Sequence, residues 1–178
     1  MKRPIFLFVI ASLLSLTGSL WAESAPVAGG FREIRLGMSL DEVKTQLAKD
    51  PYFNYRGDPD VSMLLKPDDN LIECDGVSYI SRAYFQFHDK QLYTITLVLD
   101  PSQIGFYALY TTLTAKYGDP ASLSPEEIVW QSDRYRLSLE RPLSVKWIDR
   151  QSFDQIKEAG KAQESERSLS RDEFLKEF

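Results

Sequence analysis

The chain of 178 residues carries 21 basic and 26 acidic side chains, and 43% of its residues are hydrophobic. That is enough apolar material for one globular domain, and a formal net charge of −5 argues against a nucleic-acid-binding protein, which needs a basic face for phosphates. The single Cys excludes an internal disulfide, and the single His excludes a His-rich metal site.

The N-terminus has the pattern of a secretory signal peptide. Residues 1–3 are Met-Lys-Arg, residues 5–16 are an apolar run, and Ala22 ends the segment with a small side chain. The run is shorter than the roughly 20 apolar residues that span a bilayer. We therefore expect residues 1–22 to be a cleaved signal, with a retained anchor as the alternative. The protein is predicted to be periplasmic or secreted, without a stable membrane span after processing.

Residues 23–30 are small residues with Pro and Gly, and we expect a flexible leader before a single domain of residues 31–150. The first helix is predicted over residues 39–49, because Ser39 and Glu42 form a capping box before an apolar helical face. Residues 51–76 are harder to place: two short strands between polar turns fit them best.

An antiparallel hairpin with one buried face is predicted on either side of a turn at Asp89 and Lys90. The expected inward residues are Tyr79, Ala83, Phe85 and Phe87, then Tyr93, Ile95, Leu97 and Leu99. A second helix is predicted over residues 102–117, with Asp100 as its N-cap and Gly118 at its end. Three further strands are expected over residues 128–132, 135–140 and 143–148.

This order predicts an α+β fold in which two amphipathic helices lie on one face of an antiparallel sheet. The repeated helix-then-hairpin order suggests a duplicated unit. Residues 151–178 are predicted to form a charged helical tail. A further capping box at Ser170 and Glu173 is expected to start its last turns, whose apolar end would dock on the domain or on a partner.

Two stretches resemble small envelope proteins that repeat a helix-then-sheet unit. These are residues 34–43 (Ile-Arg-Leu-Gly-Met-Ser-Leu-Asp-Glu-Val) and residues 116–120, followed by Trp130. The families are the β-barrel-assembly lipoproteins of the SmpA/OmlA type and the β-lactamase-inhibitor-like domains. The resemblance implies an exported interaction module rather than a catalyst, and it transfers no functional residue. The chain departs from the lipoproteins because no Cys stands at the signal cleavage point.

Residue types suited to chemistry are few. His88 stands alone beside the hairpin turn and is expected to be solvated. Acidic residues gather at Asp58, Asp60, Asp68, Asp69, Glu73 and Asp75. A calcium loop counted from Asp58 fails, because Met63 stands where the loop needs Gly. Cys74 lies between two acids that disfavour its thiolate, so we expect a packing role. No catalytic, metal or cofactor site is predicted.

The outward face of the hairpin is the candidate interaction surface: Ile80, Arg82, Tyr84 and Val98. Our leading interpretation is a non-catalytic envelope protein that binds a protein partner through this face. The alternatives are a hydrolase or metal-dependent enzyme that uses His88 and the acidic loop, and a small-ligand carrier with a pocket between sheet and helices. Residues 52–75 or the C-terminal tail are the alternative occupants of the outward face.

Processing at Ala22 gives the first testable expectation. The exported protein should begin at Glu23, because Ala22 ends the signal pattern. Intact-mass analysis of the exported protein measures this directly, and a mass that includes Met1 would contradict it.

Overall fold

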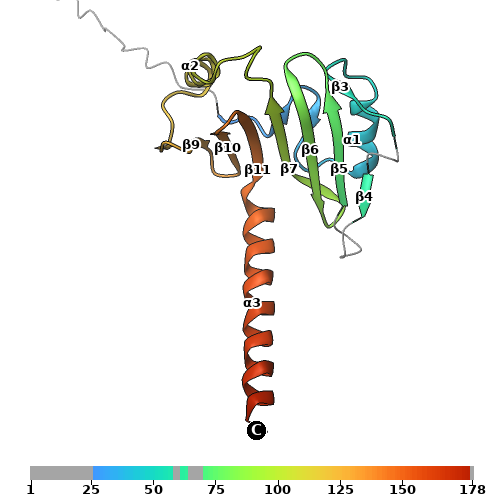
Figure 1. Cartoon of the computed structure of the whole chain (residues 1–178), viewed down its shortest axis with the longest axis vertical. Coiled ribbons are helices and arrows are strands. Elements are labelled where there is room, and N and C mark those ends of the chain that lie inside the picture. Colours follow the sequence, from blue (N-terminus) through green and yellow to red (C-terminus); the bar gives the residue numbers. More distant parts are fainter. Residues whose placement is uncertain (1–25, 58–60, 64–69, 177–178) are drawn as a thin grey trace, which may run out of the picture.

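Two antiparallel meanders meet at β7 and β11 and form one sheet of nine strands (Figure 1). The computed structural model describes residues 26–57, 61–63 and 70–176. The strand order is β3-β5-β6-β7-β11-β10-β9-β8, with β4 beside β5. The strands are β3 (Phe53–Asn54), β4 (Val61–Met63), β5 (Asn70–Gly76), β6 (Ile80–His88), β7 (Gln91–Leu99), β8 (Ser122–Leu123), β9 (Glu127–Gln131), β10 (Tyr135–Glu140) and β11 (Ser144–Asp149).

Three helices and one small hairpin complete the fold. They are β1 (Gly30–Phe31), β2 (Ile34–Arg35), α1 (Leu40–Leu47), α2 (Phe106–Tyr117) and α3 (Arg150–Leu175). The predicted α+β class with a large antiparallel sheet is therefore confirmed. The predicted signal segment and the acids at positions 58, 60, 68 and 69 lie outside the described residues.

One face of the sheet is continuous apolar core, because alternate side chains of paired strands point to the same side. Ile72 pairs with Phe85, which pairs with Ile95, which pairs with Trp147 on the next strand of the sheet. Leu137 continues the row on β10. Buried residues of α1 (Val43 and Leu47) and of α2 (Leu113 and Tyr117) belong to the same hydrophobic cluster.

The predicted first helix is confirmed with its capping box. The Ser39 N–H donates to Glu42 Oε2 at 2.8 Å, and the Glu42 N–H donates to Ser39 Oγ at 3.4 Å. The Ser39 hydroxyl also donates to Glu42 Oε2 at 2.8 Å. The bond from the Ser39 N–H and this one favour the charged carboxylate, so the pKa of Glu42 lies below its ordinary value. The cap therefore fixes both the start of α1 and the charge of its first turn.

The predicted start of the second helix is wrong. Asp100 does not cap α2 but accepts hydrogen bonds from the N–H and Oγ of Ser102, which close a turn ahead of the helix. Gly105 is the actual N-cap, with extended backbone at φ −83° and ψ 144°. The predicted end is confirmed, since Gly118 is the C-cap at φ 78°.

The predicted hairpin is confirmed, with Asp89 and Lys90 both at positive φ in its turn. Its predicted inward set is corrected at two β-bulges. One shift between Ile80 and Arg82 turns Ile80 into the core, and Tyr79 is 43% exposed. The other shift lies between Gln86 and Phe87 and makes Tyr93 the extra residue of β7. Leu92 therefore takes the core position that was predicted for Tyr93. A bulge adds one residue to one strand, so the simple alternation fails beyond it.

The tail is one continuous helix that extends away from the domain (Figure 1). Asp149 caps it by accepting a hydrogen bond from the Ser152 N–H at 3.1 Å. Ser170 lies inside this helix, so the predicted second start there is wrong. Near its far end Leu175 is 58% exposed, so this end does not dock on the described part of the domain. No helix in residues 26–57, 61–63 and 70–176 is long and apolar enough to cross a membrane.

The expected leader ends earlier than Gly30. Val27 is buried, and the Leu36 N–H donates to the Gly29 carbonyl at 2.8 Å. Gly30 then pairs with Arg35 in the β1–β2 hairpin. Residues from Val27 onward therefore belong to the packed domain, because Val27 and the residues after it pack in the hydrophobic core.

Gly30 should tolerate no side chain. Its φ is +155°, and a Cβ there would meet the backbone of Ile34 and Arg35. We expect Gly30→Ala to lower the free energy of unfolding by at least about 2 kcal/mol in urea titrations. Gly160→Ala is the control, since a Cβ there meets nothing and should change stability by less than about 1 kcal/mol. Equal stability of the two variants would contradict the role of Gly30.

Candidate functional site

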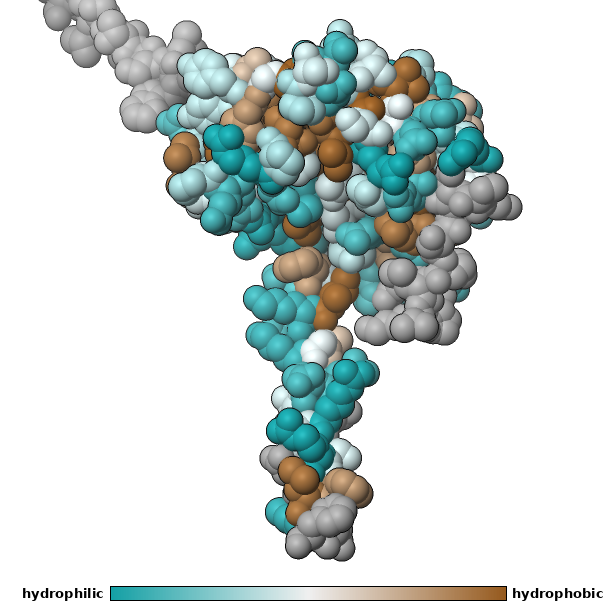
Figure 2. Space-filling view, viewed as in Figure 1, coloured by the Kyte–Doolittle hydropathy of each residue, from teal (hydrophilic) through white to brown (hydrophobic). Residues whose placement is uncertain are grey.

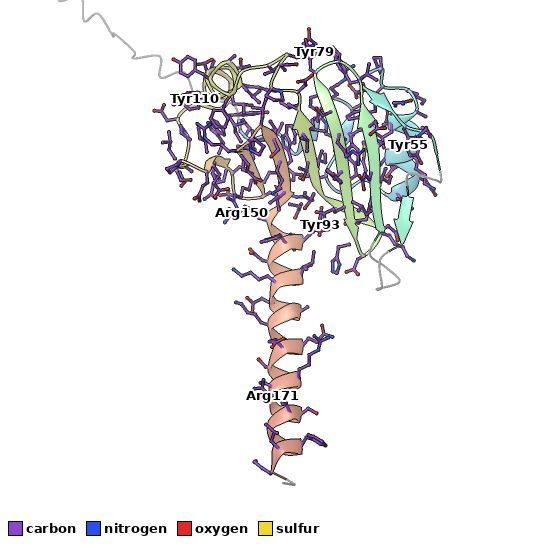
Figure 3. The ribbon with its side chains drawn as sticks, in the orientation of Figure 1. Tyr55, Tyr79, Tyr93, Tyr110, Arg150 and Arg171 are labelled. Atoms are coloured by element: carbon purple, nitrogen blue, oxygen red, sulfur yellow. The ribbon has the colours of Figure 1, made fainter. Side chains whose placement is uncertain are left out.

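A cavity of about 600 Å³ lies between α2, the β1–β2 hairpin and the inward face of the sheet. Its lining residues are Ala28, Gly30, Phe31, Arg32, Arg35, Tyr52, Tyr79, Ile80, Leu97, Leu99, Ile104, Leu109, Thr112, Leu113, Lys116, Tyr117, Val145 and Trp147. Figure 2 shows apolar surface in the upper part of the body, and Figure 3 places Tyr79 at the same end as α2.

The regular elements around the cavity position its apolar walls. Leu97 and Val145 are paired across β7 and β11 and lie at its floor. Leu109, Leu113 and Tyr117 recur every four residues, so one face of α2 supplies the opposite wall. The sequence thus places two apolar surfaces against each other without filling the space between them.

The described charged residues of the lining are all basic. Arg32, Arg35 and Lys116 line the cavity, and none of the lining residues that the structure describes is acidic. Arg32 is already engaged: its Nε donates to Asp50 Oδ2 at 2.7 Å, and its guanidinium lies 5.0 Å from the centre of the Tyr52 ring. The hydrogen bond with Asp50, more than the attraction of its charge, raises the pKa of Arg32.

Arg35 and Lys116 differ from Arg32 because neither is paired with an acid among the described residues. Both are exposed and line the cavity, so they lie where it opens to solvent. Lys116 Nζ lies 5.1 Å from the centre of the Tyr117 ring. Within the described part of the chain neither forms a salt bridge with an acid. Their positive charges therefore remain available to a ligand at the opening.

Trp147 brings a polar atom to the cavity region. Its side chain lines the cavity, and its indole N–H is buried without a hydrogen-bond partner among the described residues. The other described tryptophan, Trp130, donates its N–H to the Gly118 carbonyl at 2.9 Å. A buried donor that lacks a partner costs about 1–3 kcal/mol. The indole N–H of Trp147 is therefore an unsatisfied donor on a side chain that lines the cavity.

A family model matches residues 29–159, which include every residue of the cavity lining except Ala28. The chain belongs to the TP0088 domain family. No curated protein and no solved structure matches the chain. The matched region contains both meanders and the first turns of α3, so the cavity of this chain lies almost entirely within the matched region.

The predicted interaction face of the TP0088 domain is only partly assembled. Arg82 pairs with Val98 across β6 and β7, and Tyr84 follows two residues on, so these three share the outward face. Ile80 is corrected: it is 4% exposed and belongs to the core, because of the bulge after it. The face thus lacks the aliphatic residue predicted on β6 and keeps Val98 on β7.

The positive charge of Arg82 is taken up within the TP0088 domain. Its guanidinium donates to Glu73 Oε1 at 2.6 Å and to Asp75 Oδ1 at 3.0 Å. Both acids stand beside it on β5, so a group predicted to bind a partner is held by the domain's own strand. Docking of a protein on this face stays a prediction.

The residues considered for catalysis lie apart from the cavity. His88 Nε2 is 3.6 Å from Asp89 Oδ2, and its ring meets Tyr93 edge to face at the turn end of the hairpin. In the part of the chain that the structure describes, no three His, Cys, Asp or Glu side chains gather as a metal site.

Cys74 is 3% exposed in the core, as predicted. Its acidic neighbours point to the other face, so the burial of Cys74 and not their charge supports the predicted packing role.

Sequence reasoning missed the cavity as a particular set of residues. Arg32 and Arg35 belong to the segment beside the first helix, and Lys116 to the last turn of the second. The only sign of these residues in the sequence is that each basic side chain stands next to apolar ones in an otherwise acidic chain. That signal does not show that two distant segments face the same space.

The outward face carries a further network at β9, β10 and β11. Glu140 accepts hydrogen bonds from Lys146 Nζ at 2.9 Å and from Ser138 Oγ at 2.7 Å. Burial works against its charged form, but these bonds and the Lys146 charge outweigh burial, so the pKa of Glu140 lies below its ordinary value. A lowered pKa in the folded state means that ionised Glu140 stabilises the fold.

Glu140→Gln should therefore lower the free energy of unfolding at pH 7 by about 1 kcal/mol. The stabilisation is complete above the ordinary value of 4.5 and is lost as pH falls through the lowered folded-state pKa, where the carboxylate becomes protonated. Urea titrations at pH 7 and pH 3 measure this, with the exposed Glu126→Gln as control. A deficit of the same size at both pH values would contradict it.

Proposed function

We propose that the protein is an exported, non-catalytic binding protein of the cell envelope that holds a small apolar ligand in the cavity beside α2. One observation carries the proposal: a cavity of about 600 Å³ with mainly apolar walls. Ligand sites in proteins typically have volumes of about 300–1,000 Å³ and apolar linings. The N-terminal pattern of residues 1–22 supports the export part of the proposal.

The size of the cavity favours a ligand over an ordinary packing defect. Protein interiors are packed so tightly that spaces larger than a water molecule are few. Here Leu109, Leu113 and Trp147 border a much larger space, which costs the contacts they would make in a filled core. An apolar ligand would supply those contacts, and this gain is the source of affinity.

We propose further that α1 and α2 both cover the inward face, as helices of a duplicated unit. Each is followed along the chain by a meander, β5–β6–β7 after α1 and β9–β10–β11 after α2. The last strands of the two meanders pair antiparallel at the centre of the sheet. The cavity then lies over the junction of the units, where neither helix covers the sheet completely.

A neutral apolar fluorophore, N-phenyl-1-naphthylamine, tests the binding function. We expect saturable binding to the wild-type protein, seen as enhanced probe fluorescence. Leu109→Trp should weaken it at least tenfold, because Leu109 lines the cavity and a larger ring occupies that space. Ala108→Trp, at an exposed neighbouring position outside the lining, should leave binding unchanged.

Melting temperatures of both variants establish that they remain folded. Absence of probe binding to the folded wild type would refute the proposed function. Equal binding by the two folded variants would show that the probe lies elsewhere and would refute the site.

A further inference from the structure

We propose that the ligand is a single-chain amphiphile with an anionic head group, a carboxylate or a phosphate monoester, bound by Arg35 and Lys116. This inference rests on the proposed function and names the chemistry of its ligand. The chain of the amphiphile lies between α2 and the sheet, and the head group lies at the opening.

The distribution of charge is the first argument. The protein is acidic, with 26 acidic and 21 basic residues, yet the three charged residues among the described cavity lining are all basic. A cationic ligand would meet the charges of Arg35 and Lys116, and like charges repel. An anion meets only favourable charges there. The sign of the lining therefore selects an anionic head group.

The placement of the two available cations is the second argument. Arg35 comes from β2, and Lys116 comes from the last turn of α2, so they reach the cavity from different walls. Arg32 is neutralised by Asp50 at 2.7 Å. A carboxylate or phosphate has several acceptor oxygens and can accept from both remaining cations. The head group would thus bridge the hairpin and the helix.

The apolar volume defines the rest of the ligand. About 600 Å³ holds roughly 20 water-sized groups at about 30 Å³ each. A chain of about twelve carbons with a small head fits within this, whereas a lipid with two long chains does not. The apolar walls of Leu97, Leu109 and Val145 suit such a chain. A buried methylene should improve affinity about fourfold.

Four ligands that share a twelve-carbon chain test the head group: dodecanoate, dodecyl phosphate, dodecanol and dodecylammonium. Each displaces N-phenyl-1-naphthylamine from the wild type and from the double variant Arg35→Gln with Lys116→Gln, below its micelle concentration. The double variant should weaken dodecanoate or dodecyl phosphate about tenfold, leave dodecanol unchanged and improve dodecylammonium. The anion with the larger loss is the head group for which the site is built.

The control variant, Lys49→Gln with Lys157→Gln, makes the same change in net charge at exposed positions outside the cavity. It should bind all four ligands as the wild type does. Added salt should weaken only the anions in the wild type and should have little effect on them in the double variant.

The outcomes separate this inference from the proposed function. If the double variant loses dodecanoate, dodecyl phosphate and dodecanol equally, or loses none of them, the head-group assignment is wrong and the apolar cavity function stands. If none of the ligands displaces the probe and the probe itself does not bind, the proposed function fails. If the control variant reproduces the tenfold loss, net charge rather than these two residues is responsible, and the assignment is wrong.

Discussion

The antiparallel ladder between β7 and β11 joins two meanders that each have one apolar face. Leu97 pairs with Val145 and Ile95 pairs with Trp147, so the two faces become one continuous surface. A meander alone would leave this surface in water, where each large apolar side chain forgoes about 1.5–3 kcal/mol of burial. The joined sheet is broad enough to build a core, and every covering element packs on that shared surface.

The elements that share the core cluster with the sheet are small for a sheet of this width. α1 has 8 residues and α2 has 12, and the segment from Val27 to Leu36 packs beside them. Phe31 closes part of the gap, with its ring 6.0 Å from Trp147 and 6.2 Å from Phe53. This aromatic row fills the side nearer α1. The side nearer α2 keeps the cavity, so the proposed ligand site is the part of the inward face that the described residues leave open.

The sequence predicted those features that depend on neighbours in the chain. Alternation located β6, β7 and the later strands, and the capping box located α1, because both patterns are local. The predictions failed where one residue altered the local pattern. A bulge shifted the register so that Ile80 lies in the core, and α2 begins after Gly105 and not after Asp100. The cavity could not be predicted as a set of residues, since its lining runs from Ala28 to Trp147. The lining residues are far apart in the sequence and come together only because the strand order places their elements side by side.

Basic side chains are used differently on the two faces of the sheet. On the outward face Arg82 binds Glu73 and Asp75, Arg136 binds Glu127 at 2.8 Å, and Lys146 binds Glu140 at 2.9 Å.

These ion pairs of the outward face join neighbouring strands, so their charges are neutralised within the fold. At the cavity opening Arg35 and Lys116 have no such acid within the described residues. An acidic chain has acids enough to neutralise them, as Asp50 does for Arg32. Their place at the opening of an apolar cavity, and not the number of charges, is the reason for proposing them as groups for binding rather than for folding.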